Sequence, residues 1–99
     1  METTAPAPQR LDQIVDRLKA MADPTRLRIL YALRDEEELC VGDVTDRLDC
    51  SQANASKQLA VLKRAGLVRR RREGMNVFYA LDCDAVFDVC ALMCRRDGS

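Results

Sequence analysis

The 99-residue chain has no histidine and no tryptophan, and it has only two tyrosines and two phenylalanines. It also lacks a G-x-S-x-G motif, a glycine-rich phosphate loop and a recognisable pair of catalytic carboxylates. We therefore do not expect an enzyme. No run of about 18 apolar residues is present, which argues against a membrane span. The first ten residues lack the apolar stretch of a signal peptide, so we expect a cytoplasmic protein.

The formal net charge is zero, but the charges are segregated along the chain. Residues 35–49 hold seven acids and one base, whereas residues 57–72 hold seven bases and no acid. A basic block can engage a polyanion locally even when the whole protein is neutral. On charge alone, an ordinary solvated face explains this block equally well.

The hydrophobic pattern predicts four helices, a hairpin and a final helix in one domain over residues 10–96, after a disordered tail over residues 1–9. Asp23-Pro24 marks the start of the second helix, because Asp is a good N-cap and Pro suits the first turn. Ser51 caps the fourth helix and Gly66 ends it. Two strands follow, joined by a turn that contains Gly74.

This order predicts a mainly α fold with a β-hairpin wing, a winged helix-turn-helix that binds double-stranded DNA. The second helix of such a unit enters the major groove, and the hairpin lies beside the duplex. The apolar first and last helices favour a homodimer. Candidate DNA-binding residues are the polar side chains at the start of the fourth helix and the arginines of the hairpin: Ser51, Gln52, Asn54, Ser56, Lys57, Arg69, Arg70, Arg71 and Arg72.

Three segments resemble the ArsR/SmtB family of metal-sensing repressors: MADPTRLRIL at residues 21–30, SQANASKQL at 51–59, and the wing from AGLV at 65–68 to VFYAL at 77–81. The resemblance covers about residues 11–94. It implies a dimer built from the first and last helices, and repression that is relieved when an inducer binds. One departure lies in the fourth helix, where Gln58 stands at a position often held by histidine.

Five cysteines in a cytosolic chain suggest metal binding or redox sensing rather than structural disulfides. The family's thiol site on the third helix is reduced here to Cys40, because Gly42 and Thr45 occupy the other two positions. On the last helix, Cys90 and Cys94 are four residues apart and can approach each other. They are our candidate metal ligands, with Cys83 and Cys40 as further candidates.

Three hypotheses for regulation remain open. The first is a repressor released from its operator by a soft metal or metalloid such as As(III), Cd(II) or Pb(II), which thiols bind well. The second is a repressor that senses oxidants or reactive sulfur through Cys90 and Cys94. The third is a constitutive DNA-binding protein with no inducer, in which the cysteines only pack as small apolar residues. None of the three needs a cofactor in the DNA-bound form.

Overall fold

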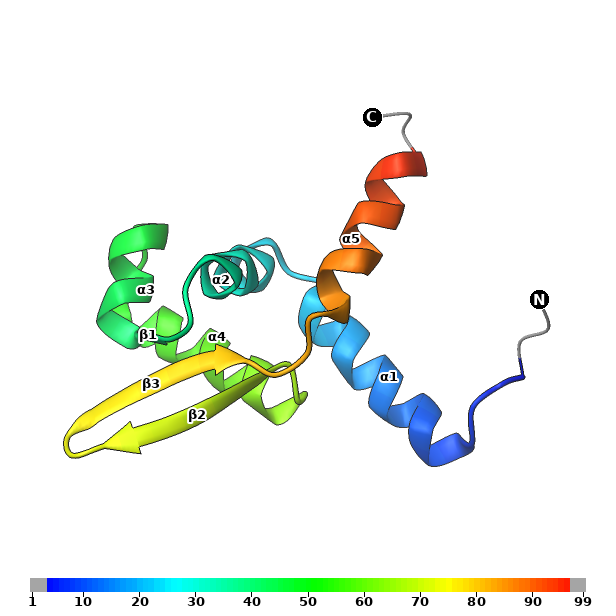
Figure 1. Ribbon diagram of the computed structural model, residues 1–99, viewed down its shortest axis with the longest axis horizontal. Helices are drawn as coiled ribbons and strands as arrows, with labels where there is room; N and C mark the ends of the chain where they lie inside the picture. The colour runs from blue at the N-terminus through cyan, green and yellow to red at the C-terminus, as the bar shows by residue number, and fades with distance from the viewer. Residues whose placement is uncertain (1–3, 97–99) are drawn as a thin grey trace.

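A computed structural model describes residues 4–96, with five helices and a three-stranded antiparallel sheet (Figure 1). The helices are α1 (Pro8–Met21), α2 (Pro24–Asp35), α3 (Val41–Leu48), α4 (Gln52–Arg64) and α5 (Ala85–Arg96), and the strands are β1 (Leu39–Cys40), β2 (Val68–Glu73) and β3 (Asn76–Leu81). The expected order of four helices, hairpin and fifth helix is confirmed. Pro8 and Gln9, which we expected in the tail, already belong to α1. Residues 1–3 of that tail lie outside the described residues.

Strand β1 was not predicted. It pairs with β3 in antiparallel register, with Leu39 opposite Tyr79 and Cys40 opposite Phe78, and the sheet order is β1-β3-β2. Two residues are too few to show the alternation that marks a strand in sequence. Only the neighbouring strand β3 reveals that this segment is extended.

The predicted helix boundaries follow from local capping. The Asp23 carboxylate accepts a hydrogen bond from the backbone N–H of Arg26 at 3.0 Å, and the Ser51 hydroxyl accepts one from the N–H of Asn54 at 3.1 Å. Gly66 has a φ of +81° after the end of α4, a conformation that glycine adopts without steric penalty. The helix-turn-helix turn is closed by Asp49, which adopts the left-handed conformation at the end of α3.

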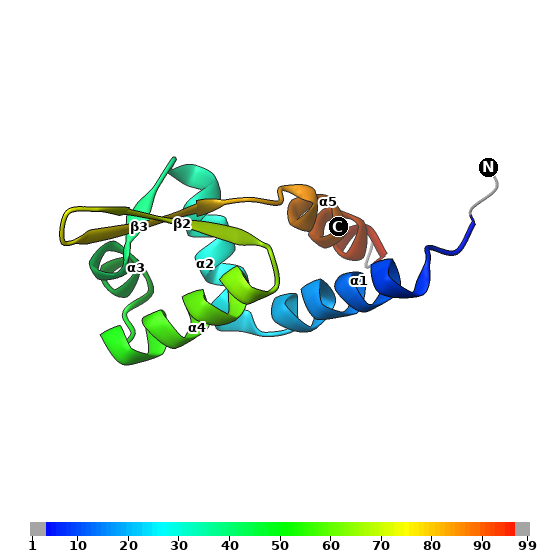
Figure 2. The same cartoon turned by 90° about the horizontal axis from the view of Figure 1, so that it is seen from below.

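The core lies between the sheet and the helices α2, α3 and α4. Its largest fully buried side chains are aliphatic: Ile29, Leu30, Leu33, Val44, Leu59, Leu62 and Leu67. In β2 and β3, Val68 and Tyr79 face this core, because alternate residues of a strand point to the same side. Figure 2 shows α3 and α4 on one side of the hairpin, so α4 and one face of the hairpin are presented together.

At the end of the molecule opposite the β2–β3 turn, the start of α5 lies beside the second half of α1, and the two helices diverge from there (Figure 1). Both expose apolar side chains that the single chain does not cover. On α1 these are Leu11, Val15 and Leu18, which are 43–49% exposed, and on α5 Val89, Leu92 and Met93, which are 38–67% exposed. Within residues 4–96, none of the helices combines the length and apolar character that crossing a bilayer requires.

Candidate nucleic-acid interface

Helix α4 presents a polar surface because its apolar residues recur on the opposite side. Ala55, Leu59 and Leu62 are buried against the core, whereas Gln52, Ser56 and Lys57 are exposed. The Ser51 cap holds the first turn, where free backbone N–H groups favour a phosphate. The residues predicted to face DNA therefore share the exposed side of α4, with Asn54 half-buried beside them.

The four arginines of β2 divide between the two faces of the sheet. Arg70 and Arg72 follow Val68 at a spacing of two, so they share the face that packs on the helical core. Both arginine side chains are nevertheless exposed. Within residues 4–96, neither Arg70 nor Arg72 forms an ion pair or a side-chain hydrogen bond. Phosphate binding by Arg70 and Arg72 stays a prediction.

Arg71 lies on the other face and is held by the protein itself. It forms a two-pronged ion pair with Glu38 at 2.8 and 2.9 Å and a second ion pair with Glu73 at 2.5 Å. Its guanidinium also lies 4.9 Å from the centre of the Phe78 ring. The hydrogen bonds from Arg71 are the main reason why the pKa of Glu38 is lowered, and the carboxylates raise the pKa of Arg71.

Arg69, on the same face as Arg71, is also engaged. It donates a hydrogen bond to the carbonyl oxygen of Leu81 and forms an ion pair with Asp82 at 3.5 Å. The acidic block predicted from sequence therefore lies partly within reach of the wing, since its Glu38 binds Arg71. DNA contacts by Arg69 and Arg71 stay a prediction, whereas their existing partners are part of the fold.

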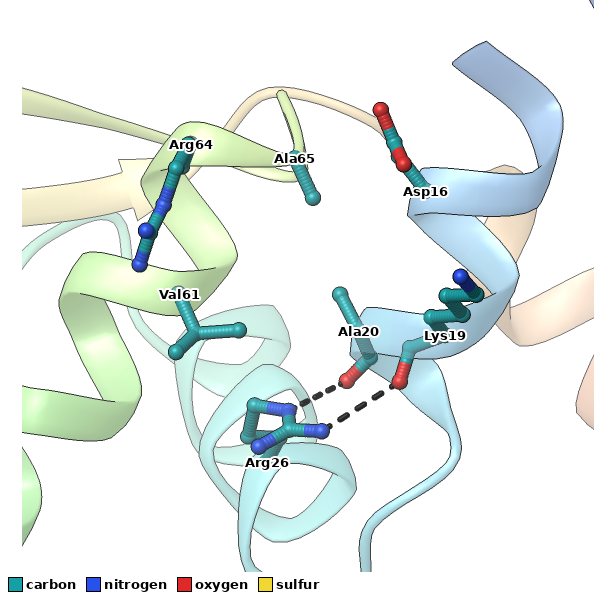
Figure 3. A pocket seen from close by; sticks show the side chains of 7 residues that line it. All are labelled: Asp16, Lys19, Ala20, Arg26, Val61, Arg64 and Ala65. Carbon is teal, nitrogen blue, oxygen red and sulfur yellow. Dashed lines mark hydrogen bonds between the residues drawn. The ribbon is translucent and has the colours of Figure 1, made fainter. Parts of the chain in front are cut away.

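The sequence reasoning gave no role to Arg26 and noted Gln58 only as a departure from the family pattern. Arg26 of α2 donates to the side-chain oxygen of Gln58 at 2.8 Å, and the Gln58 amide nitrogen donates to the Asn54 side-chain oxygen at 3.1 Å. Figure 3 shows the Arg26 guanidinium also bonded to the backbone oxygens of Lys19 and Ala20. No periodicity in the sequence links Arg26 to Gln58, because they are 32 residues apart.

The cysteines do not gather within one chain. Among the residues that the structure describes, no three cysteines or carboxylates are arranged to hold a metal ion. Cys90 is half-buried and Cys94 is exposed on α5, whereas Cys83 lines an apolar groove between α1 and α5. Cys40 lies at the start of α3, where its thiol donates to Asp43 at 3.2 Å and lowers the pKa of that carboxylate. Cys90 and Cys94 stay a prediction as ligands, as do Cys83 and Cys40.

Cys90 contacts an aromatic group that joins α5 to α2. The Tyr31 and Phe87 rings meet edge to face with their centres 4.9 Å apart, and the Arg34 guanidinium lies over both. A side-chain hydrogen bond with Cys90 is the largest cause of a raised pKa of Tyr31, followed by desolvation. The thiol at position 90 is therefore connected to α2, the helix that also carries Arg26.

A helix-turn-helix, an exposed polar helix and a basic hairpin on the same side define a winged helix DNA-binding domain. The profile of the arsR family of bacterial regulatory proteins matches residues 23–70. The transcriptional activator HlyU of Vibrio cholerae is 46% identical over 78 residues, which cover 79% of this chain and 71% of HlyU. The chain belongs to the arsR family of DNA-binding transcription regulators, and its fold is that of the family.

Other relatives show how far the similarity extends. A homologue of the cadmium resistance regulatory protein CadC from Staphylococcus aureus is 46% identical over 68 residues, 69% of this chain but only 56% of that protein. A solved HlyU structure from V. cholerae covers 94% of this chain with a TM-score of 0.75 at 40% identity and is itself covered in full. The homodimeric winged helix domain of Mb0332 from Mycobacterium bovis, solved by NMR, covers 99% of this chain, with 91% of its own length matched, at a TM-score of 0.76 and 30% identity.

Proposed function

We propose that this protein is a cytoplasmic, homodimeric repressor that binds a double-stranded DNA operator through α4 and the wing, and leaves it when an inducer engages Cys90 and Cys94. The observation that carries the DNA-binding part is the open side formed by Gln52, Ser56 and Lys57 of α4 with Arg70 and Arg72 of β2. Gln side chains suit the edge of adenine, and Lys and Arg suit phosphate or guanine.

The homodimer is supported by the exposed apolar residues of α1 and α5, which are adjacent at one end of the chain. Val89→Asp should shift the protein from dimer to monomer in sedimentation experiments and weaken DNA binding together with it, because a charge would be placed in the apolar interface. Met75→Asp is the matched control for the sedimentation experiment, since Met75 is 99% exposed at the β2–β3 turn, away from α1 and α5. A Val89→Asp variant that stays dimeric would contradict this interface.

A soft metal or metalloid is the inducer that we place first. Cys90 and Cys94 supply two thiol donors on one helix, and As(III), Cd(II) and Pb(II) favour such ligands. A third donor must come from elsewhere, and Cys83 of a second copy is the candidate, because α5 belongs to the proposed interface. Binding there would bias the spacing of the two α4 helices, which must match successive major grooves about 34 Å apart. The relatives include regulators named for cadmium and arsenic resistance.

Thiol oxidation is the second candidate, and two observations favour it. One chain alone does not complete a three-ligand site, and the relatives include HlyU, for which a reduced form has been solved. In this case the Cys90 thiolate attacks an added peroxide, is oxidised to sulfenic acid as the peroxide is reduced, and condenses with Cys94 to a disulfide with release of water. The hydrogen bond between Tyr31 and Cys90 would be lost in the oxidised state.

One titration distinguishes these candidates. As(III), Cd(II), Pb(II) and hydrogen peroxide are added in turn to a complex of the protein with a fluorescent operator, and release is followed by anisotropy. We expect release by a metal or by peroxide that disappears in Cys90→Ser/Cys94→Ser and persists in Cys50→Ser, the matched thiol control. Release that persists in the double variant contradicts the thiol assignment. A complex that no reagent dissociates identifies a constitutive DNA-binding protein.

A further inference from the structure

A chain of hydrogen bonds runs from the end of α1 through α2 to the exposed start of α4. The Arg26 guanidinium is fixed by the backbone oxygens of Ala20 at 2.6 Å and Lys19 at 3.2 Å (Figure 3). These are among the last carbonyl groups of α1, which have no partner within that helix. The remaining nitrogen of the guanidinium, Nη1, donates to Gln58 at 2.8 Å. Any movement of the Arg26 guanidinium would therefore break these hydrogen bonds to the end of α1.

Arg26 determines which atom donates and which accepts in each of the following hydrogen bonds. A guanidinium has donors only, so the Gln58 atom that faces Arg26 must be the oxygen Oε1. The Gln58 nitrogen Nε2 consequently faces Asn54, and the Asn54 atom that receives its hydrogen bond must be the oxygen Oδ1. The Asn54 nitrogen Nδ2 is left over. Within residues 4–96 it has no hydrogen-bond partner.

Asn54 belongs to the first turns of α4 and is half-buried, with its oxygen turned toward Gln58. An unconstrained asparagine can turn its amide over and offer DNA either a donor or an acceptor. In this chain Gln58 selects one of the two orientations. We propose that Arg26 and Gln58 make Asn54 a donor toward DNA, so that Asn54 recognises an acceptor on a base edge, guanine O6 or thymine O4.

This inference rests on the proposed placement of α4 in the major groove and adds a specificity rule to it. Cytosine N4 and adenine N6 are donors in that groove, so they are disfavoured opposite the Asn54 nitrogen. Gln58 acts here as a positioning residue, because its side chain touches Asn54 and Arg26 rather than the base. Gln52, which has no such partner in residues 4–96, keeps both orientations and can still pair with adenine.

A double-mutant cycle tests the proposal. Sequences are selected from a random duplex library with the full-length wild-type protein, and binding to the selected site and its single-base variants is measured for Gln58→Leu, Asn54→Ala and the double variant. Gln58→Leu should reduce the preference for an acceptor base at one position about tenfold, within the range typical of one good base contact. In the Asn54→Ala background Gln58→Leu should change nothing, because the group it positions is gone.

The Gln58→Glu variant is expected to reverse the orientation of the Asn54 amide. Its carboxylate accepts hydrogen bonds from Arg26 and from the Asn54 nitrogen, so the Asn54 amide turns over and offers its oxygen to DNA. The ranking of bases at that position should shift toward adenine N6 or cytosine N4. The ranking is compared rather than the affinity, because the added negative charge weakens binding to every sequence alike. Thermal melting of each variant confirms that it is folded.

The outcomes separate the inference from the proposed function. A Gln58→Leu effect that is equal in both backgrounds, or a base ranking that Gln58→Glu leaves unchanged, overturns the inference alone. An Asn54→Ala variant that loses the same affinity for all sequences places Asn54 on a phosphate and also overturns it. A folded wild-type protein that enriches no sequence overturns the proposed function and the inference together.

Discussion

The two faces of strand β2 carry the same residue type in different surroundings. On the face shared with Val68, Arg70 and Arg72 have no ionic partner within residues 4–96. On the opposite face, Arg69 is paired with Asp82, and Arg71 with Glu38 and Glu73. The four consecutive arginines therefore fall into two pairs: Arg70 and Arg72 are open to solvent, whereas Arg69 and Arg71 are paired with acidic side chains.

The difference shows that a run of basic residues in a strand is not a uniform basic patch. The two-residue period of the strand sends alternate side chains to opposite faces, and β1 then brings an acidic segment next to only one of them. Because Glu38 directly precedes β1, the pairing of β1 with β3 places its carboxylate beside Arg71. Arg70 and Arg72, on the other face, mark the side on which we place DNA.

The largest expected effect tests directly whether the two arginine pairs differ in DNA binding. Arg70→Ala/Arg72→Ala should weaken binding to all DNA sequences by about tenfold or more at moderate salt, and should reduce the slope of log affinity against log salt by about 2, since about one counterion is released per phosphate contact. Arg69→Ala/Arg71→Ala removes the same net charge and is the matched control. We expect a clearly smaller change in slope for it. Equal slopes in fluorescence titrations from 50 to 200 mM salt would refute the division.

A smaller effect is expected at the turn that joins the two strands. Gly74 has a φ of +62°, and no atom lies within 4 Å of a Cβ built on it, so Gly74→Ala meets only the backbone penalty. We expect a loss of about 1–2 kcal/mol in the free energy of unfolding, measured by urea denaturation. Gly42→Ala in α3 is the control, because Gly42 lacks a positive φ and has only one atom within 4 Å, at 3.9 Å. A loss as large at Gly42 would contradict the backbone explanation.

The smallest expected effect is a pH dependence of the stability that the Glu38–Arg71 ion pair contributes. Arg71 lowers the pKa of Glu38 in the folded state, so this pair stabilises the fold above the ordinary glutamate pKa of 4.5. The stabilisation is lost as the pH falls through the lowered pKa. Glu38→Gln should therefore have a slightly lower melting temperature than wild type at pH 6, and the difference should shrink toward pH 3. Curves that stay parallel over this range would show that the pair contributes nothing measurable, as many exposed ion pairs do.

Local chemistry made most of the fold predictable. The caps at Asp23 and Ser51, the apolar spacing of α4 and the glycines at positions 66 and 74 act within a few residues, so the helix order and the hairpin follow from neighbouring positions. Strand β1 could not be found in this way. Its two residues become a strand only because β3 offers unpaired backbone groups, which is a long-range event.

The DNA-facing surface was predictable as a set of residues, but its internal organisation was not. The order of residues already places polar side chains at the start of α4, four arginines after Val68 and two cysteines one helical turn apart. The tertiary structure decided which arginines stay open, that Gln58 joins Arg26 to Asn54, and that Cys90 contacts Tyr31 of α2. The physical reason is that spacing along a chain sets which face a side chain takes, whereas its partner comes from another element that only folding brings near.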